Sequence, residues 1–272
     1  MMRYYDPNNN RLVYVKSRAN ERFWDEHWGR MDASILYKPI VSPSNFVVNT
    51  TGKHLPTKSL ILEGGAGLAQ NSWNLHLSGY RTIALDFTPK TIDFVKRYRP
   101  EVQPTLGDVR NLPLQDESID GYWSLGVIEH FYDGYDEILS EMRRVIRKDG
   151  YLFLTFPHIS KLRQIKVRKG LYEIWPGNGD LVANFYQFAL DQHRVIEAFG
   201  VYEFKLILKK CFDGVKGFKD EIRTGKSCMQ AIYDGGTQKT KLVRRLLDKL
   251  LRPWASHMVL MVFKRQTSGI AL

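Results

Sequence analysis

The sequence is poor in cysteine, in long apolar runs and in repeated segments, and each shortage excludes a class of protein. Its two cysteines, Cys211 and Cys228, form no CxxC pair and no disulfide framework. The best apolar run, Met258 to Phe263, is far shorter than the roughly 20 residues of a membrane-spanning helix and suits a strand. The first ten residues, MMRYYDPNNN, lack the apolar run of a secretory signal. We therefore expect a cytoplasmic protein.

Acidic residues are also in the minority, since 40 Lys and Arg face 29 Asp and Glu and leave a net charge of +11. The excess is concentrated from Lys205 to Arg252, where 13 basic residues stand against 5 acidic ones. A second basic run, between residues 161 and 169, contains no acidic residue. Such clusters attract nucleic acid, anionic lipid or a phosphorylated substrate, or are simply a solvated surface, and charge alone does not choose between them.

The pattern of apolar residues changes along the chain. Residues 17–30 place Phe23, Trp24, His27 and Trp28 on one face at helical spacing, which predicts an aromatic-rich helix. From about residue 59, short apolar runs alternate with amphipathic stretches, which indicates an α/β fold with a parallel sheet covered on both faces. The predicted strands are Ser59–Glu63, Thr82–Asp86, Ile119–Ser124 and Tyr151–Phe156, and the predicted helices between them are Asn71–Ser78, Pro89–Tyr98 and Tyr135–Ile146.

The second half of the chain is less regular. About 47 residues separate its two predicted strands, far more than a hairpin needs. Its expected parts are an irregular basic stretch over 157–185, a helix over Leu190–Phe199, and strands over Val201–Lys209 and His257–Lys264. We divide the chain into an N-terminal helical segment, 1–55, and a main domain, 56–272, with a lid-like stretch, 157–190, and a basic insert, 210–255.

The basic insert contains an amphipathic helix, Lys239–Arg252, which we expect Pro253 to stop. Leucines and a valine recur in pairs every four residues along it, and basic residues occupy most other positions. Such a helix can cover the protein's own core, join a second subunit or lie on the anionic inner face of a membrane.

A glycine-rich turn follows the first predicted strand of the main domain. Glycines at 65 and 67 allow a tight turn from strand to helix and let a flat ligand approach the backbone. The GxGxxG fingerprint fails because Gln70 stands where its third glycine belongs, which disfavours an NAD-dependent oxidoreductase. The phosphate-binding loop GxxxxGK also fails. The turn instead reads E-x-G-x-G, beginning at Glu63.

Further acids stand at the ends of later strands. Asp86 ends the second strand, where a carboxylate can accept hydrogen bonds from both hydroxyls of a ribose. Asp108 follows the expected third strand and can accept from an adenine amino group. After the fourth strand comes SLGVIEHF, an apolar turn that ends in Glu129 and His130. Each acid alone is often a cap or turn residue, but acids in this order at one sheet edge indicate a nucleoside site.

This pattern resembles the class I (Rossmann-like) methyltransferases that use S-adenosylmethionine, over about residues 55–210. The resemblance implies a doubly wound, mostly parallel, seven-stranded sheet with helices on both faces and an antiparallel last strand. It also implies S-adenosylmethionine as the cofactor. The residues that match the family's cofactor site are Glu63, Gly65, Gly67, Asp86, Phe87, Asp108, Val109 and Ser124.

The resemblance also suggests where the acceptor binds. His130 stands just past the fourth strand and is the candidate general base. Residues expected around the acceptor are Glu129, Tyr172, Trp175, Phe185 and Tyr186. Some relatives bind a metal through an E-x-x-E-H motif, but Gly126 replaces the first acid here, so we expect no metal.

The acceptor itself stays open at this point. The basic insert and the lid-like stretch resemble those of methyltransferases that modify small molecules, lipids or cell-envelope sugars. A nucleic-acid methyltransferase is the alternative that the charge suggests, although the Pro-Pro-aromatic motif of many such enzymes is missing after the fourth strand. A non-catalytic binding protein of the same fold is a second alternative.

Overall fold

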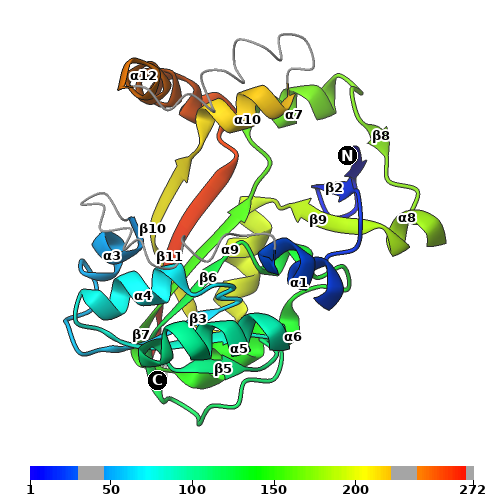
Figure 1. Ribbon diagram of the computed structural model, residues 1–272. Coiled ribbons are helices and arrows are strands. Elements are labelled where there is room, and N and C mark those ends of the chain that lie inside the picture. Colours follow the sequence, from blue (N-terminus) through cyan, green and yellow to red (C-terminus); the bar gives the residue numbers. More distant parts are fainter. Residues whose placement is uncertain (30–45, 222–237, 268–272) are drawn as a thin grey trace, which may run out of the picture.

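A computed structural model describes residues 1–29, 46–221 and 238–267. Cys228 and residues 222–237 of the basic insert lie outside the described residues. The centre of the protein is a seven-stranded sheet in the order β10-β11-β7-β6-β3-β4-β5 (Figure 1). Its strands are β3 (Leu60–Gly64), β4 (Arg81–Asp86), β5 (Pro104–Leu106), β6 (Ile119–Leu125), β7 (Ile146–Pro157), β10 (Phe204–Phe212) and β11 (Met258–Arg265).

The strand directions confirm the predicted fold class. The pairs β3–β4, β3–β6, β4–β5 and β6–β7 are parallel, whereas β11 runs antiparallel to both β7 and β10. The central strands are nearly continuous apolar runs because both of their faces are covered.

Alternate residues of the strands pack against helices on opposite faces of the sheet. On one face, Leu62, Leu152 and Met261 share a buried cluster with α6 (Asp136–Val145) and α9 (Gln192–Val201). On the other, Ile61 and Phe153 share a cluster with α3 (Phe46–Thr51) and α4 (Gln70–Leu77). The further helices α5 (Pro89–Tyr98) and η1 (Pro100–Val102) lie along β4 and β5. The α-helical period of the sequence thus places one stripe of each helix on the sheet.

The N-terminal residues form a second, four-stranded sheet that the sequence analysis did not predict. Its order is β8-β1-β2-β9, built from β1 (Met2–Asp6), β2 (Arg11–Val15), β8 (Glu173–Ile174) and β9 (Phe185–Ala189). The expectation that 1–55 is helical is therefore wrong for residues 2–15, whereas α1 (Glu21–Gly29) and α3, among the described residues of this segment, match it. The expectation of an irregular 157–185 is also wrong, since α7 (Lys161–Arg168) and α8 (Gly179–Ala183) lie there as well.

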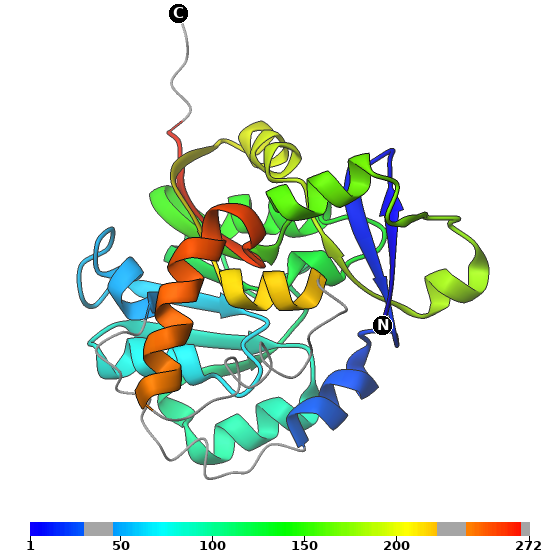
Figure 2. The same cartoon turned by 90° about the horizontal axis from the view of Figure 1, so that it is seen from above.

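The C-terminal part differs from the prediction at several boundaries, of which two are the clearest. The strand expected at Val201 begins at Phe204 because α9 continues to Val201. The helix expected to stop before Pro253 is α12 (Gln238–Ala255), which includes Pro253. Figure 2 shows α12 beside α10 (Gly214–Glu221), and both helices connect β10 to β11. Within the described ranges, no helix combines the length and the apolar character that crossing a membrane requires.

Candidate functional site

A cavity of about 650 Å³ lies where β3, β4 and β6 end. The carboxyl ends of parallel strands are where open α/β sheets bind ligands. The segment that enters α1 covers part of this cavity, through Arg18 to Glu21 and the rings of Trp24 and Trp28. Of the eight residues predicted to hold the cofactor, six line the cavity: Glu63, Gly65, Asp86, Phe87, Asp108 and Val109.

The glycine turn is held in a left-handed conformation by hydrogen bonds to β4. Gly65 and Gly67 have φ angles of +72° and +51°, a region that favours glycine. The amides of Gly65 and Ala66 both donate to the carbonyl of Leu85, at 2.9 Å each. A Cβ at Gly67 would stand 2.6 Å from the Trp28 ring, so in this structure an aromatic side chain packs on Gly67. Gly65 and Ala66, rather than Gly67, face the cavity.

Glu63 connects the end of β3 to the first turn of α4. Its carboxylate accepts hydrogen bonds from the Ser72 amide at 2.8 Å, the Ser72 hydroxyl at 2.5 Å and Asn71 Nδ2 at 3.0 Å. Burial raises the pKa of Glu63, while these donors oppose the rise. Glu63 thus satisfies an amide of the first turn of α4 and also lines the cavity.

Asp86 organises the same turn from the end of β4. One carboxylate oxygen accepts from the Gly67 amide at 2.8 Å, and the other accepts from the amide and the hydroxyl of Thr88 at 3.0 and 2.6 Å. The carboxylate is buried, yet it remains part of the cavity lining beside the exposed ring of Phe87.

Asp108 forms an ion pair that the sequence did not predict. Arg110 Nη2 stands 2.6 Å from its carboxylate, and both side chains are roughly half exposed in the cavity mouth. The hydrogen bonds from Arg110 hold the pKa of Asp108 below its usual value, and burial opposes them. Val109 beside them is buried and supplies an apolar wall.

The predicted contact at Ser124 does not reach the cavity. Ser124 is fully buried within β6, and the next three residues, Leu125, Gly126 and Val127, form the lining instead. Gly126 has a φ of +71°, which turns the chain away from the strand. The cavity therefore begins one residue later than the sequence indicated.

His130 lies at the end of η2 (Ile128–His130) and lines the cavity. Its Nδ1 stands 2.7 Å from the carbonyl oxygen of Tyr186. A carbonyl only accepts, so Nδ1 carries the proton, and Nε2 of the neutral ring keeps a lone pair. Burial lowers the pKa of His130 to about 4, against the effect of this hydrogen bond. The rings of Trp24 and Tyr186 meet it edge-on, each at a centroid distance of 5.2 Å.

Glu129, the residue before His130, is not part of the cavity lining. The side chain is buried, and its Oε2 has no hydrogen-bond partner among the described residues. Burial raises the pKa of Glu129 to about 8, only partly offset by its own amide. This side chain is therefore protonated at neutral pH, directly next to His130.

Of the aromatic residues expected around the acceptor, only Phe185 lines the cavity. Tyr186 contributes its carbonyl to His130, and Trp175 packs against Tyr4 and Tyr132. The aromatic lining comes mainly from residues that the sequence analysis did not assign to the site: Trp24, Trp28, Phe131 and Tyr132. The helical spacing of the aromatic residues in α1 was recognisable in the sequence. The neighbouring sequence did not indicate that this helix would cover the cavity.

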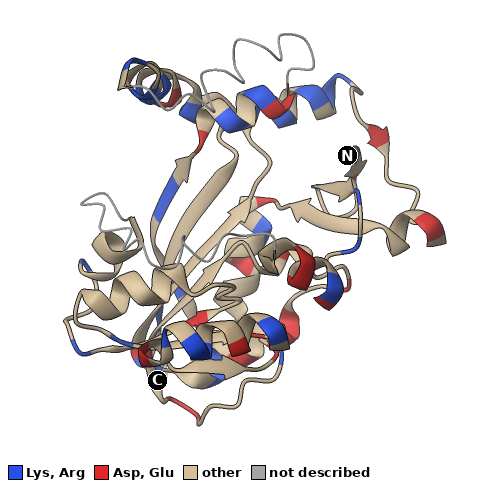
Figure 3. Ribbon diagram, viewed as in Figure 1, with Lys and Arg blue, Asp and Glu red and all other residues tan. Residues whose placement is uncertain are grey.

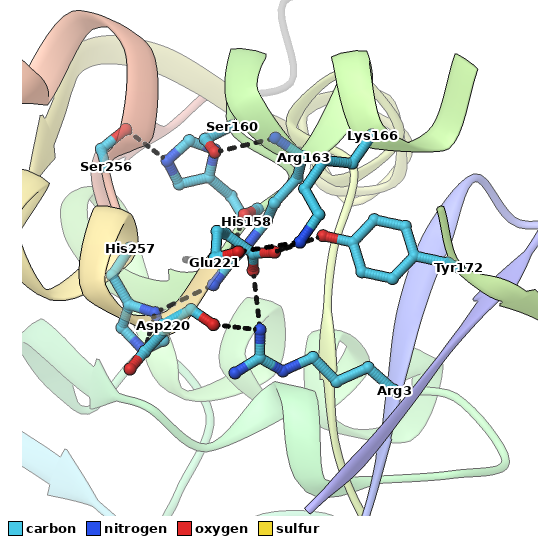
Figure 4. A network of polar contacts seen from close by, with 10 residues as sticks. All are labelled: Arg3, His158, Ser160, Arg163, Lys166, Tyr172, Asp220, Glu221, Ser256 and His257. Carbon is cyan, nitrogen blue, oxygen red and sulfur yellow. Dashed lines mark hydrogen bonds and ion pairs between the residues drawn. The ribbon is translucent and has the colours of Figure 1, made fainter. Parts of the chain in front are cut away.

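Tyr172 belongs to a different cluster, a network around Glu221 (Figure 4). The Glu221 carboxylate accepts from Tyr172 Oη at 2.5 Å, Lys166 Nζ at 2.8 Å, Arg163 Nε at 3.0 Å and Arg3 Nη1 at 3.1 Å. These contacts fasten β1 and α7 to α10, so Tyr172 has a structural environment away from the cavity.

No group of three or more His, Cys, Asp or Glu side chains suited to a metal ion occurs in the described part of the chain. Glu129 and His130 follow one another in sequence without a third ligand beside them. The cavity is lined by acids, backbone groups and aromatic rings.

Comparison with known proteins shows which sequences and folds this chain resembles. Residues 62–154 match the family described as a methyltransferase domain. The malonyl-[acyl-carrier protein] O-methyltransferase of Yersinia pestis is 30% identical over 99 residues, which cover 36% of this chain and 37% of that protein. The chain spans less than two thirds of the length of each curated relative that it matches.

Solved structures share the fold over almost the whole chain. Geranyl diphosphate C-methyltransferase from Streptomyces coelicolor A3(2) superposes with a TM-score of 0.56 at 11% identity, covering 92% of this chain and all of that chain. The 1,6-didemethyltoxoflavin-N1-methyltransferase of Burkholderia thailandensis gives a TM-score of 0.55 at 14% identity, covering 98% of this chain and all of that chain. Residues 62–154 thus match a methyltransferase domain, and the chain as a whole has the fold of the class I, S-adenosylmethionine-dependent methyltransferases.

Proposed function

We propose that this protein transfers a methyl group from S-adenosylmethionine to a small-molecule, lipid or cell-envelope sugar acceptor. The observation that carries the proposal is one continuous cavity lined both by strand-end acids and by an aromatic wall beside His130. A volume of about 650 Å³ lies within the range of small-molecule sites.

The residues that would hold the cofactor follow from their chemistry. Asp86 would accept from the ribose hydroxyls, and Asp108 with Val109 would bind the adenine. The backbone at Gly65 would lie beside the methionine portion, where its missing side chain permits close approach. When bound, S-adenosylmethionine supplies a methyl carbon activated by its sulfonium.

His130 is proposed to orient the acceptor. Because Nδ1 is committed to the Tyr186 carbonyl, Nε2 is the ring atom able to accept a hydrogen bond. With a pKa of about 4, the ring stays neutral at physiological pH and holds a transferred proton weakly. It therefore suits positioning of a hydroxyl or amine, with proton transfer onward to water.

The charge of the lining favours a small acceptor over a nucleic acid. Five acidic residues and two basic ones line the cavity, although the chain as a whole is basic. Phosphate backbones bind where Lys and Arg gather, and one of these two arginines already pairs with Asp108. Aromatic rings and acids together suit an uncharged or cationic apolar group.

Calorimetry with S-adenosylmethionine tests the proposal. We expect saturable binding to the intact protein, no comparable binding of NAD, and about 10- to 150-fold weaker binding for Asp86→Ala, which corresponds to a lost charged hydrogen bond of roughly 1.5–3 kcal/mol. Asp93→Ala, an exposed acid on α5, is the matched control and should bind as the natural protein does. Equal affinity in Asp86→Ala and Asp93→Ala would contradict the assignment of the site.

A further inference from the structure

Helix α12 has an apolar stripe that points away from the protein. Leu242, Leu246, Leu250 and Trp254 recur every four residues and are 59%, 57%, 69% and 57% exposed. Val243 extends the same stripe at 43% exposed. Ala255 is the helix's single buried residue. An amphipathic helix of a globular protein normally turns such a stripe toward the core, so this orientation needs an explanation.

The contacts of the opposite face determine this orientation. A Cβ at Gly217 of α10 would stand 1.8 Å from the Ala255 carbonyl oxygen, so the two helices touch through bare backbone. Asp248 accepts from the Gly214 amide at 2.6 Å and thereby caps the first turn of α10. Leu247 and Leu251 lie on this inner side and are partly buried. The inner face is occupied, and the outer leucines cannot share it.

Basic side chains border the exposed stripe. Helix α12 carries six Lys and Arg and one acid, Asp248, which faces α10. Arg245 and Lys249 are exposed at the edge of the stripe. Lys161 of α7 adds to this border, because its Nζ stands 5.3 Å from the centre of the Trp254 ring. Figure 3 shows basic residues along α7, α10 and α12 on one side of the molecule.

We propose that this outer face of α12 binds an anionic lipid surface. Leucines and a tryptophan suit the boundary between headgroups and acyl chains, and the basic border suits anionic headgroups. The phosphate backbone of a nucleic acid would pair with the basic side chains but would leave the leucines exposed to water. A second copy would bring the same basic border into contact with itself and repel it. The inference does not depend on the proposed methyl transfer.

Vesicle sedimentation with the full chain tests this surface. We expect binding to phosphatidylcholine vesicles that contain phosphatidylglycerol at low salt, no binding to pure phosphatidylcholine, and release at high salt because screening shortens the reach of the charges. The variants Arg245→Glu/Lys249→Glu and Leu246→Ser/Leu250→Ser should each weaken binding at least about tenfold. All four side chains are exposed, so these variants should keep the fold, which circular dichroism checks.

The matched control reverses two exposed basic residues at the other end of the molecule, Lys96→Glu/Arg97→Glu on α5. It should bind vesicles as the natural protein does. The proposal fails if the protein stays in the supernatant with anionic vesicles at low salt, or if this control weakens binding as much as Arg245→Glu/Lys249→Glu. It also fails if the variant Leu246→Ser/Leu250→Ser binds vesicles as the natural protein does. The same holds if this variant turns an oligomer into a monomer while vesicle binding stays unchanged.

Discussion

Two buried glutamates in this protein have opposite surroundings. Glu221 accepts from a tyrosine, a lysine and two arginines, whereas the Oε2 of Glu129 has no partner among the described residues. Burial by itself would raise the pKa of Glu221, but the charge of Arg163 and the other donors hold it at about 2. Burial without such partners raises the pKa of Glu129 to about 8.

The difference shows that partners, rather than depth, decide what a buried acid does. Glu221 is an anion at neutral pH that joins segments far apart in the sequence through its hydrogen bonds and ion pairs. Glu129 is a neutral acid beside the cavity, and its Oε2 can still form a hydrogen bond. In structural networks, buried acids usually have hydrogen-bond partners that keep their pKa values low. A buried acid with a strongly raised pKa and no partner is therefore more typical of a functional site.

Removing Glu221 should have the largest effect. Glu221→Ala leaves Arg163, which has no exposed surface, as an uncompensated buried charge. We expect the free energy of unfolding to fall by about 3–5 kcal/mol, measured by denaturant titration. Asp116→Ala breaks an exposed pair with Arg144 and should cost less than about 1 kcal/mol. A loss in Glu221→Ala no larger than in Asp116→Ala would show that the network contributes nothing.

Replacing Glu129 should change the pH dependence of stability more than stability itself. Because its folded pKa is raised from 4.5 to about 8, its contribution is fully present below about pH 4.5 and lost as the pH rises through 8. Glu129→Gln resembles the protonated acid in shape and cannot ionise. We therefore expect the variant to lose less unfolding free energy than the natural protein between pH 4.5 and 8.

Denaturant titrations across this pH range measure the effect, with the exposed Glu137→Gln as control. Parallel pH curves for Glu129→Gln and the natural protein would mean that Glu129 is charged or paired. Glu221 should behave oppositely, since its lowered pKa makes its contribution present above about pH 4.5 and lost as the pH falls toward 2.

The smallest effect is expected at Arg110, which pairs with an acid that is half exposed rather than buried. Arg110→Ala should change the free energy of unfolding by less than about 1 kcal/mol, because solvent screens a half-exposed pair. The pKa of Asp108 should rise toward its usual value, as followed by NMR titration. If Arg110→Ala lost as much unfolding free energy as Glu221→Ala, burial would not be the reason why ion pairs in this protein differ in their contribution to stability.

Much of the main domain could be predicted from local sequence. The period of the apolar residues located the strands of the parallel sheet and the helices between them, because each element buries a face that its own sequence defines. The acids at or just past the ends of β3, β4 and β5 met at one cavity because parallel strands end at the same edge. The position of the cavity therefore followed from strand order alone.

Local sequence did not show which distant segments would touch. The hairpin of β1 and β2 pairs through β2 with β9, about 170 residues later in the chain, and Arg3 contacts Glu221. Trp28 packs on Gly67, and α12 turns its leucines outward because Gly217 and Asp248 occupy its other face.

The sequence by itself determined the type of the parallel strands and of the helices between them, the glycine turn and the set of acids, because backbone preference and side-chain period act between near neighbours. Only the tertiary structure decided which acid gained a partner, which aromatic rings covered the cavity and which face of α12 met solvent. These outcomes depend on packing between segments far apart in the chain, where small shifts in position choose between contact and exposure.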